Sequence, residues 1–204
     1  MKTIHNLIII DASGSMGSKR EEVTGGLNEL FKQIKKDDKA SKEIKNVITV
    51  IDFSSSGDFN VVYDKVTTSK LKLLKKGDYK TRGMTALFDA IGKSFLLIPE
   101  DAEAVFVNIL TDGLENDSKE FKRSDIKSLI TNQEENNWTV TFMGTTQESM
   151  LSAERIGIKK DRMLRYADSK AGTTVALDKL KRAKNVHTTA VMESSYPENL
   201  FADE

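Results

Sequence analysis

An apolar run near the N-terminus ends in a loop rich in side-chain oxygens, and this junction constrains the fold more than any other part of the chain. The run is Leu7-Ile8-Ile9-Ile10, and the loop is Asp11-Ala12-Ser13-Gly14-Ser15. A parallel strand buried on both faces is typically a continuous hydrophobic run, and open α/β sheets bind ligands just beyond the carboxyl ends of such strands. The junction therefore predicts an α/β fold with a binding site at one edge of its sheet.

The rest of the chain alternates between strand-like and helical patterns. Further buried strands are predicted at residues 46–51, 59–63, 104–110, 138–143 and 163–166. Apolar residues at helical spacing predict helices at 23–34, 85–98, 125–135 and 173–183, with Ser124 as the cap of the third and 35–45 as a charged connector.

The order of these elements defines a fold class. Because only residues 54–58 separate the second and third strands, these two are expected to form an antiparallel hairpin. The alternation elsewhere predicts a doubly wound, mostly parallel six-stranded sheet with one antiparallel strand and helices on both faces, a Rossmann-like α/β architecture.

The amino-acid composition limits the partners and the cellular location that we expect for this protein. The 204 residues include 31 basic and 31 acidic side chains, so the net charge of zero gives no overall attraction to nucleic acid or to an anionic membrane. There is no cysteine, and no apolar run approaches membrane-spanning length. We expect one cytoplasmic domain over residues 1–187, followed by an acidic, flexible tail over 188–204.

Two later segments carry similar oxygen donors to the same predicted edge of the sheet. Arg82-Gly83-Met84-Thr85 precedes a predicted helix, and Leu110-Thr111-Asp112-Gly113 follows a predicted strand. If the strands ending at Asp11 and Asp112 are neighbours, two carboxylates and three hydroxyls surround one point, which is an environment suited to magnesium. Taken alone, Asp11, Ser13 and Ser15 could instead form a turn that caps the following helix, and a helix cap for Thr85 or a turn for Asp112 would be the better interpretation.

Together, the three motifs resemble the von Willebrand factor A (vWA) domain, over about residues 4 to 185. The metal-ion-dependent adhesion site of that family is built from an Asp-x-Ser-x-Ser loop, a distant threonine and a distant aspartate. The resemblance implies that Ser13, Ser15 and Thr85 bind an ion through their hydroxyls, and that Asp11 and Asp112 bind it directly or through water. The implied ion is Mg²⁺, with Mn²⁺ or Ca²⁺ as substitutes.

The resemblance also implies a function. It suggests an intracellular adaptor of the bacterial or phage type, in which a partner protein supplies an aspartate or glutamate carboxylate to the ion. Some relatives act alongside AAA-type ATPases, and neither nucleic acid nor membrane is an expected partner. One departure is Arg82-Gly83-Met84, where many members have a small residue or a glycine pair. This bulkier segment is expected to narrow access to the ion.

An enzyme is the alternative, namely a metal-dependent hydrolase or phosphatase that uses the same ion. Against it, Ser13-Gly14-Ser15-Met16-Gly17 misses the nucleophile-elbow pattern at its first position. The two histidines are predicted to lie elsewhere, His5 inside the first strand and His187 beyond the last helix. We therefore expect a protein that binds and does not catalyse.

Two charged segments remain open to two interpretations. Residues 70–82 contain six basic side chains and one acidic side chain, a local net charge of +5, which fits either a solvated surface or a device that steers an acidic partner. The acidic tail is either simply flexible or supplies a carboxylate to the metal site of its own or a neighbouring molecule.

Overall fold

A computed structural model describes residues 1–201; residues 202–204 are outside the description. Six strands form one sheet in the order β3-β2-β1-β4-β5-β6. The strands are β1 (Lys2–Asp11), β2 (Ile44–Phe53), β3 (Phe59–Thr67), β4 (Ala104–Leu110), β5 (Trp138–Gly144) and β6 (Met163–Arg165). Every neighbouring pair is parallel except β2 with β3, which is antiparallel. The predicted fold class is confirmed.

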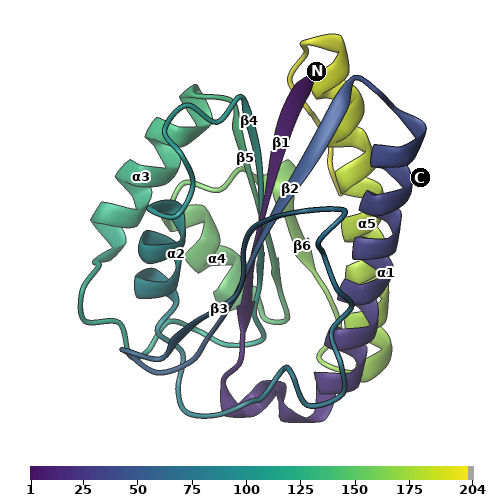
Figure 1. Ribbon diagram of the computed structural model, residues 1–204. Coiled ribbons are helices and arrows are strands. Elements are labelled where there is room, and N and C mark those ends of the chain that lie inside the picture. Colours follow the sequence, from purple (N-terminus) through teal and green to yellow (C-terminus); the bar gives the residue numbers. More distant parts are fainter. Residues whose placement is uncertain (202–204) are drawn as a thin grey trace.

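Helices cover both faces of this sheet (Figure 1). One face carries α1 (Arg20–Ala40) and α5 (Lys170–Glu193), and the other carries α2 (Leu87–Phe95), α3 (Arg123–Glu135) and α4 (Gln147–Arg155). Two short 3-10 helices are η1 (Gly14–Lys19) and η2 (Lys160–Arg162). In the part of the chain that the structure describes, none of the helices has the length and apolar character needed to cross a membrane.

The apolar run of β1 is continuous because both of its faces are buried. Ile4, Ile8 and Ile10 pack on the α1–α5 side, whereas Leu7 and Ile9 pack on the α2–α3–α4 side. Successive strand side chains point to opposite faces, so a strand in the middle of a covered sheet needs apolar residues at both parities.

Two adjacent glycines in α1 have different surroundings. A Cβ atom added at Gly26 would lie 2.4 Å from Leu177 Cδ1, so α1 and α5 pack closely only because this side chain is absent. A Cβ atom added at Gly25 would meet nothing within 4 Å. Packing between α1 and α5 therefore requires Gly26 and not Gly25.

The helix boundaries depart from the sequence prediction in several places. Helix α1 includes residues 35–40 of the expected connector, and α2 is shorter than predicted. The prediction that Ser124 caps α3 is wrong, because the N-cap is Lys122, whose backbone N–H donates to the Asp125 carboxylate at 2.8 Å. Helix α4 was not predicted; the Thr146 hydroxyl accepts the Ser149 N–H at its start.

Helix α5 runs further than expected, to Glu193, so the predicted boundary after residue 187 falls within it and His187 lies inside the helix. Beyond it, Leu200 is buried in the core on the α1–α5 side, and the Tyr196 hydroxyl donates to the Glu134 carbonyl at 2.7 Å. Residues 188–193 of the expected tail are thus helical, and Tyr196 and Leu200 contact the rest of the domain, whereas Glu198 and Asn199 are exposed. Residues 202–204 of that tail lie outside the described residues.

Candidate metal site

Four of the five predicted site residues emerge at the carboxyl edge of the sheet from its two central strands. Strands β1 and β4 are parallel neighbours, with Ile10 opposite Leu110, so Asp11 follows one residue and Asp112 two residues beyond this pair. The helix after β1 packs on one face, and the helix after β4 packs on the other. This is the topological switch point, where open α/β sheets leave a crevice for ligands.

The loop after β1 and the loop after β4 share a chain of short hydrogen bonds. The Asp11 carboxylate accepts the Ser13 N–H at 2.7 Å and the Thr111 hydroxyl at 2.6 Å. The Ser13 and Ser15 hydroxyl oxygens are 3.1 Å apart, and the Ser15 hydroxyl donates to Asp112 Oδ1 at 2.6 Å. Four of the five predicted ligands therefore lie in one cluster.

The fifth predicted ligand, Thr85, approaches the cluster across Gly113. A Cβ atom added at Gly113 would lie 3.3 Å from the Thr85 hydroxyl oxygen and 3.8 Å from Asp11 Oδ2. The backbone of Thr85 is fixed by Asn116, which accepts its N–H at 2.9 Å and donates to its carbonyl at 3.0 Å. The structure thus brings all five predicted residues to one place.

The segment before α2 is fastened to the first loop. Gly14 N–H donates to the Gly83 carbonyl at 3.2 Å, and Arg82 N–H donates to the Ala12 carbonyl at 2.7 Å. The Arg82 guanidinium donates to Asp52 at 2.8 Å and to Asp58 at 2.5 Å, so it is tied to β2 and the β2–β3 turn. The Arg82 side chain is therefore held by Asp52 and Asp58, while that of Met84 is 50% exposed.

Sequence reasoning missed a lysine that contacts the site. Lys19 Nζ donates to Asp112 Oδ2 at 2.5 Å and also bonds Asp168, from the loop between β6 and α5. Only 4% of the Lys19 side chain is exposed. Burial lowers the pKa of Lys19, but its bonds to Asp112 and Asp168 outweigh burial and hold the pKa above its usual value. The ammonium is therefore charged at neutral pH.

For Asp11, in contrast to Lys19, burial has a larger effect on the pKa than the hydrogen bonds have. Burial raises the pKa of its carboxyl, the charge of Asp112 adds to that effect, and the bonds from Thr111 and Ser13 offset it only in part. The surroundings in the protein alone thus leave the negative charge of Asp11 incompletely compensated.

The donor set fits a hard divalent cation. Carboxylate and hydroxyl oxygens are the ligands that Mg²⁺ and Ca²⁺ prefer, and no thiolate or imidazole belongs to the cluster. Within residues 1–201, no group of three or more His, Cys, Asp or Glu side chains could hold a metal ion. A cation at this edge would therefore depend on the serine and threonine hydroxyls as much as on the two carboxylates.

A second acidic cluster lies nearby, and its carboxylates already accept hydrogen bonds from the backbone of the protein. Asp89, in the first turn of α2, accepts the backbone N–H groups of Lys119, Glu120 and Phe121, each at 2.9 Å. Glu115 accepts the Phe88 N–H at 2.9 Å. Burial would raise the pKa of Asp89, but the backbone bonds outweigh it and hold the pKa below its ordinary value. These carboxylates fasten the loop after β4 to α2.

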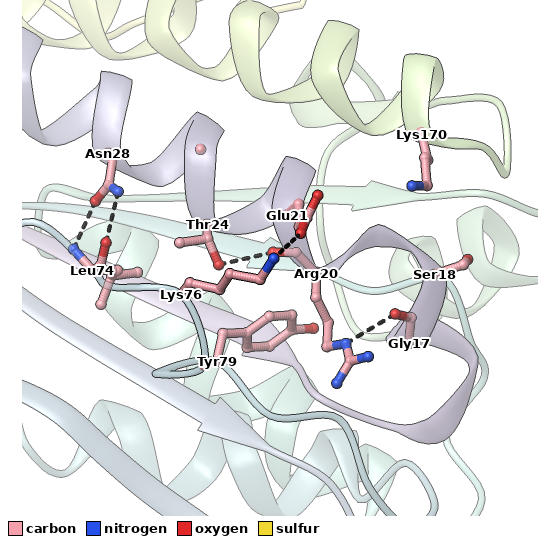
Figure 2. Close-up of a pocket in the computed structure, with 12 residues that line it drawn as sticks. Gly17, Ser18, Arg20, Glu21, Thr24, Asn28, Leu74, Lys76, Tyr79 and Lys170 are labelled. Atoms are coloured by element: carbon pink, nitrogen blue, oxygen red, sulfur yellow. Dashed lines mark hydrogen bonds and ion pairs between the residues drawn. The ribbon is translucent and has the colours of Figure 1, made fainter.

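A basic pocket of about 780 Å³ adjoins the candidate site, between α1 and residues 74–79 (Figure 2). Arg20, Lys76 and Lys170 line it together with Glu21; Lys76 pairs with Glu21 at 3.0 Å and Lys170 with Glu22 at 3.7 Å, so the lining keeps a net positive charge. Tyr79 connects the pocket to the site, because its hydroxyl donates to the Asp11 carbonyl. An acidic ligand at the candidate site would therefore have positive charge beside it.

The backbone is similar to solved structures that share little sequence with it. The pilus adhesin SpaC from Lactobacillus rhamnosus GG, in its open conformation, matches 93% of this chain with a TM-score of 0.71 and 13% identity. The PilB minor pilin from Streptococcus sanguinis matches 96% with a TM-score of 0.64 and 12% identity. The SpRpn10 VWA domain matches 86% with a TM-score of 0.58 and 13% identity.

These likenesses establish the fold alone. This chain spans 30% of the adhesin, 64% of the pilin and 94% of the VWA domain. No protein-family model and no curated protein matches the sequence. The fold is therefore of the vWA type, as the sequence motifs implied.

Proposed function

We propose that this protein is a binding module that holds a divalent cation at the candidate site and uses it to bind a carboxylate of a partner protein. Mg²⁺ is the proposed ion, with Mn²⁺ or Ca²⁺ as substitutes. Asp11, Ser13, Ser15, Thr85 and Asp112 are the proposed ligands, directly or through water. Aspartate or glutamate from the partner would complete the coordination.

One observation carries the proposal: oxygen donors from three separate loops converge at the switch point of the sheet. A site with two carboxylates and neutral hydroxyls leaves a divalent ion short of negative charge, so an anionic ligand is favoured in an open position. The names of the similar structures agree with this class, since they include a pilus adhesin and a VWA domain.

The charge around the site supports an acidic partner. The pocket beside the site carries Arg20, Lys76 and Lys170, and the lysines of residues 70–80 are largely exposed. Leu71, Leu74 and Tyr79 bury their side chains and anchor this segment to the domain. A fixed basic surface increases the association rate of an acidic partner, and salt weakens the effect.

Binding is favoured over catalysis by the position of the histidines. His187 is buried in α5, where its ring stacks on Phe106 at 4.7 Å, and His5 lies in the interior of β1. Neither lies at the carboxyl edge where the proposed ion would be. A general base or nucleophile beside the metal is what a hydrolase or phosphatase would require.

The first test is metal binding by the purified protein. Calorimetric titration with Mn²⁺ and with Mg²⁺ should give one site in the native protein and none in Asp112→Ala. Glu148→Ala, which removes an exposed carboxylate from α4, is the matched control and should bind like the native protein. Equal binding by native protein and Asp112→Ala would contradict the proposed site.

The second test concerns the partner. Lysate of the source cell is passed over native protein, Asp112→Ala and Glu148→Ala, each with Mg²⁺ and with chelator. A protein retained by native and Glu148→Ala only when Mg²⁺ is present would support the proposal and identify the partner. Equal retention under all conditions would place binding away from the metal. Phosphate-ester and carboxyl-ester substrates with Mg²⁺ test the enzymatic alternative.

A further inference from the structure

A buried ammonium group lies against one of the proposed metal ligands. Lys19 Nζ is 2.5 Å from Asp112 Oδ2, while the other oxygen of the same carboxylate accepts the Ser15 hydroxyl at 2.6 Å. The side chains of Lys19 and Asp112 are 4% and 1% exposed. Each oxygen of Asp112 thus has an internal donor, and one of these donors carries a full positive charge.

The charges near the site do not favour a cation on its own. Asp11 and Asp112 contribute two negative charges, and Lys19 cancels one of them at hydrogen-bond distance from Asp112. A divalent ion added to these three groups leaves an excess of one positive charge, which the Asp168 carboxylate offsets only in part because it is exposed and screened by solvent. Repulsion between the ion and the ammonium is weakly screened, because the lysine side chain is buried.

We propose that Lys19 is a built-in competitor of the metal ion, which weakens binding of the free cation so that a carboxylate ligand strengthens its retention. This inference rests on the proposed function. One carboxylate from a partner would bring the sum of these formal charges to zero. The ion and the partner would then each strengthen binding of the other, because such coupling is reciprocal.

Asp168 moderates this competition. It contacts Lys19 from the loop before α5, and its side chain is 63% exposed, so it is free to follow the ammonium. Asp168 offers the ammonium an alternative partner when an ion takes up the oxygens of Asp112. Without Asp168, Lys19 would have Asp112 alone as its counter-ion. The two residues therefore act on metal affinity in opposite directions.

The test is calorimetric titration with Mn²⁺ alone, with no partner present, on the native protein and three variants. Lys19→Met removes the charge and keeps a long side chain, so we expect affinity about tenfold higher, the equivalent of about 1.4 kcal/mol. Lys19→Arg keeps the charge and should stay near the native value. Asp168→Asn should bind about threefold more weakly, the screened effect of an exposed group.

The sign of the change separates competition from a structural role. If Lys19 merely held Asp112 in place, Lys19→Met would bind Mn²⁺ more weakly than native protein, and the inference would be overturned while the proposed function stood. Should Lys19→Met not fold, the exposed Asp168→Asn still decides: unchanged or tighter binding refutes the inference.

Two further outcomes separate this inference from the proposed function. Binding by Lys19→Met but not by native protein would support the competitor role, and the native protein would then need the carboxylate of a partner to bind the ion. Absence of binding in every variant would overturn both proposals. Melting curves with and without Mn²⁺ provide a second readout that does not depend on heat of binding.

Discussion

Two groups of acidic side chains lie at the carboxyl edge of the same sheet and are satisfied differently. Asp89 accepts three backbone N–H groups, which hold its pKa below the ordinary value. Asp11 accepts one backbone N–H and one hydroxyl, and its burial keeps the pKa raised. The charge of Asp89 is therefore compensated within the fold, whereas that of Asp11 is not.

The difference shows how a structural carboxylate can be distinguished from one suited to a ligand. Both side chains are buried, Asp11 completely and Asp89 at 3% exposure, so burial alone does not separate them. The donors around each carboxylate do separate them. Removing the Asp89 cluster should cost stability, and removing the Asp11 cluster should cost metal binding.

The largest effect is expected for Asp89→Ala. The change leaves three backbone N–H groups without their acceptor, so the free energy of unfolding should fall by about 3 kcal/mol. Urea denaturation measures the loss. Glu120→Ala truncates an exposed carboxylate on the same loop and should change stability by less than about 0.5 kcal/mol. If Asp89→Ala lowered the free energy of unfolding as little as the control does, Asp89 could not be distinguished from Asp11 as a structural carboxylate.

The double variant Ser13→Ala/Ser15→Ala should lose metal binding and keep most of its stability. Without metal, its stability should stay within about 1 kcal/mol of native, because Ser15 is exposed and the hydroxyls mainly bond one another and Asp112. Native protein should gain about 2.7 kcal/mol at a Mg²⁺ concentration 100 times the dissociation constant. Thermal melting should show this gain in native protein and not in the double variant. An equal gain in both would contradict the hydroxyl ligands.

The pH dependence of stability sharpens the same contrast. Because the pKa of Asp89 is lowered in the folded protein, its stabilisation is complete above its ordinary pKa of 3.8 and is lost as the pH falls through the folded-state value. The stability difference between native protein and Asp89→Asn should thus be widest near neutral pH and should close in acid. Denaturant midpoints of both proteins across pH measure this stability difference. A difference that widens in acid would contradict a lowered pKa for Asp89.

The smallest effect is expected on Mn²⁺ affinity, when each of two glycines at the site is replaced by alanine. A Cβ atom at Gly113 would be 3.3 Å from the Thr85 hydroxyl oxygen, whereas one at Gly14 would be 3.7 Å from the Gly83 carbonyl, an ordinary contact. Gly113→Ala should weaken Mn²⁺ binding about threefold by displacing Thr85, and Gly14→Ala should leave it unchanged. Equal affinities in calorimetry would place Thr85 outside the coordination.

Much of the fold was predictable because its strands are continuous apolar runs. The neighbouring positions of β1 and β4 followed from the fold class, and with them the convergence of Asp11 and Asp112. Helix α4 was missed because only Ser149, Met150 and Ala153 are buried, too few for a clear helical stripe. The end of α5 was missed because polar residues occupy buried positions there: Lys184 and His187 are each 1% exposed.

The contacts of Lys19 could not be predicted from its place in the sequence. Its partners are Asp112 and Asp168, which come from two distant loops. Nothing in the local pattern distinguishes a lysine that pairs inside a site from one on the surface. Such a pair depends on side-chain direction, which sequence spacing alone does not determine at the end of a 3-10 helix.

The pairing of β1 with β4 also bears on the order of events during folding. The residues that meet there, Ile10 and Leu110, are separated by half of the chain, so the site forms only after a long loop has closed. The unfolded chain has no preformed cluster for an ion to bind. A cation held by these loops would consequently slow unfolding and leave the rate of folding almost unchanged.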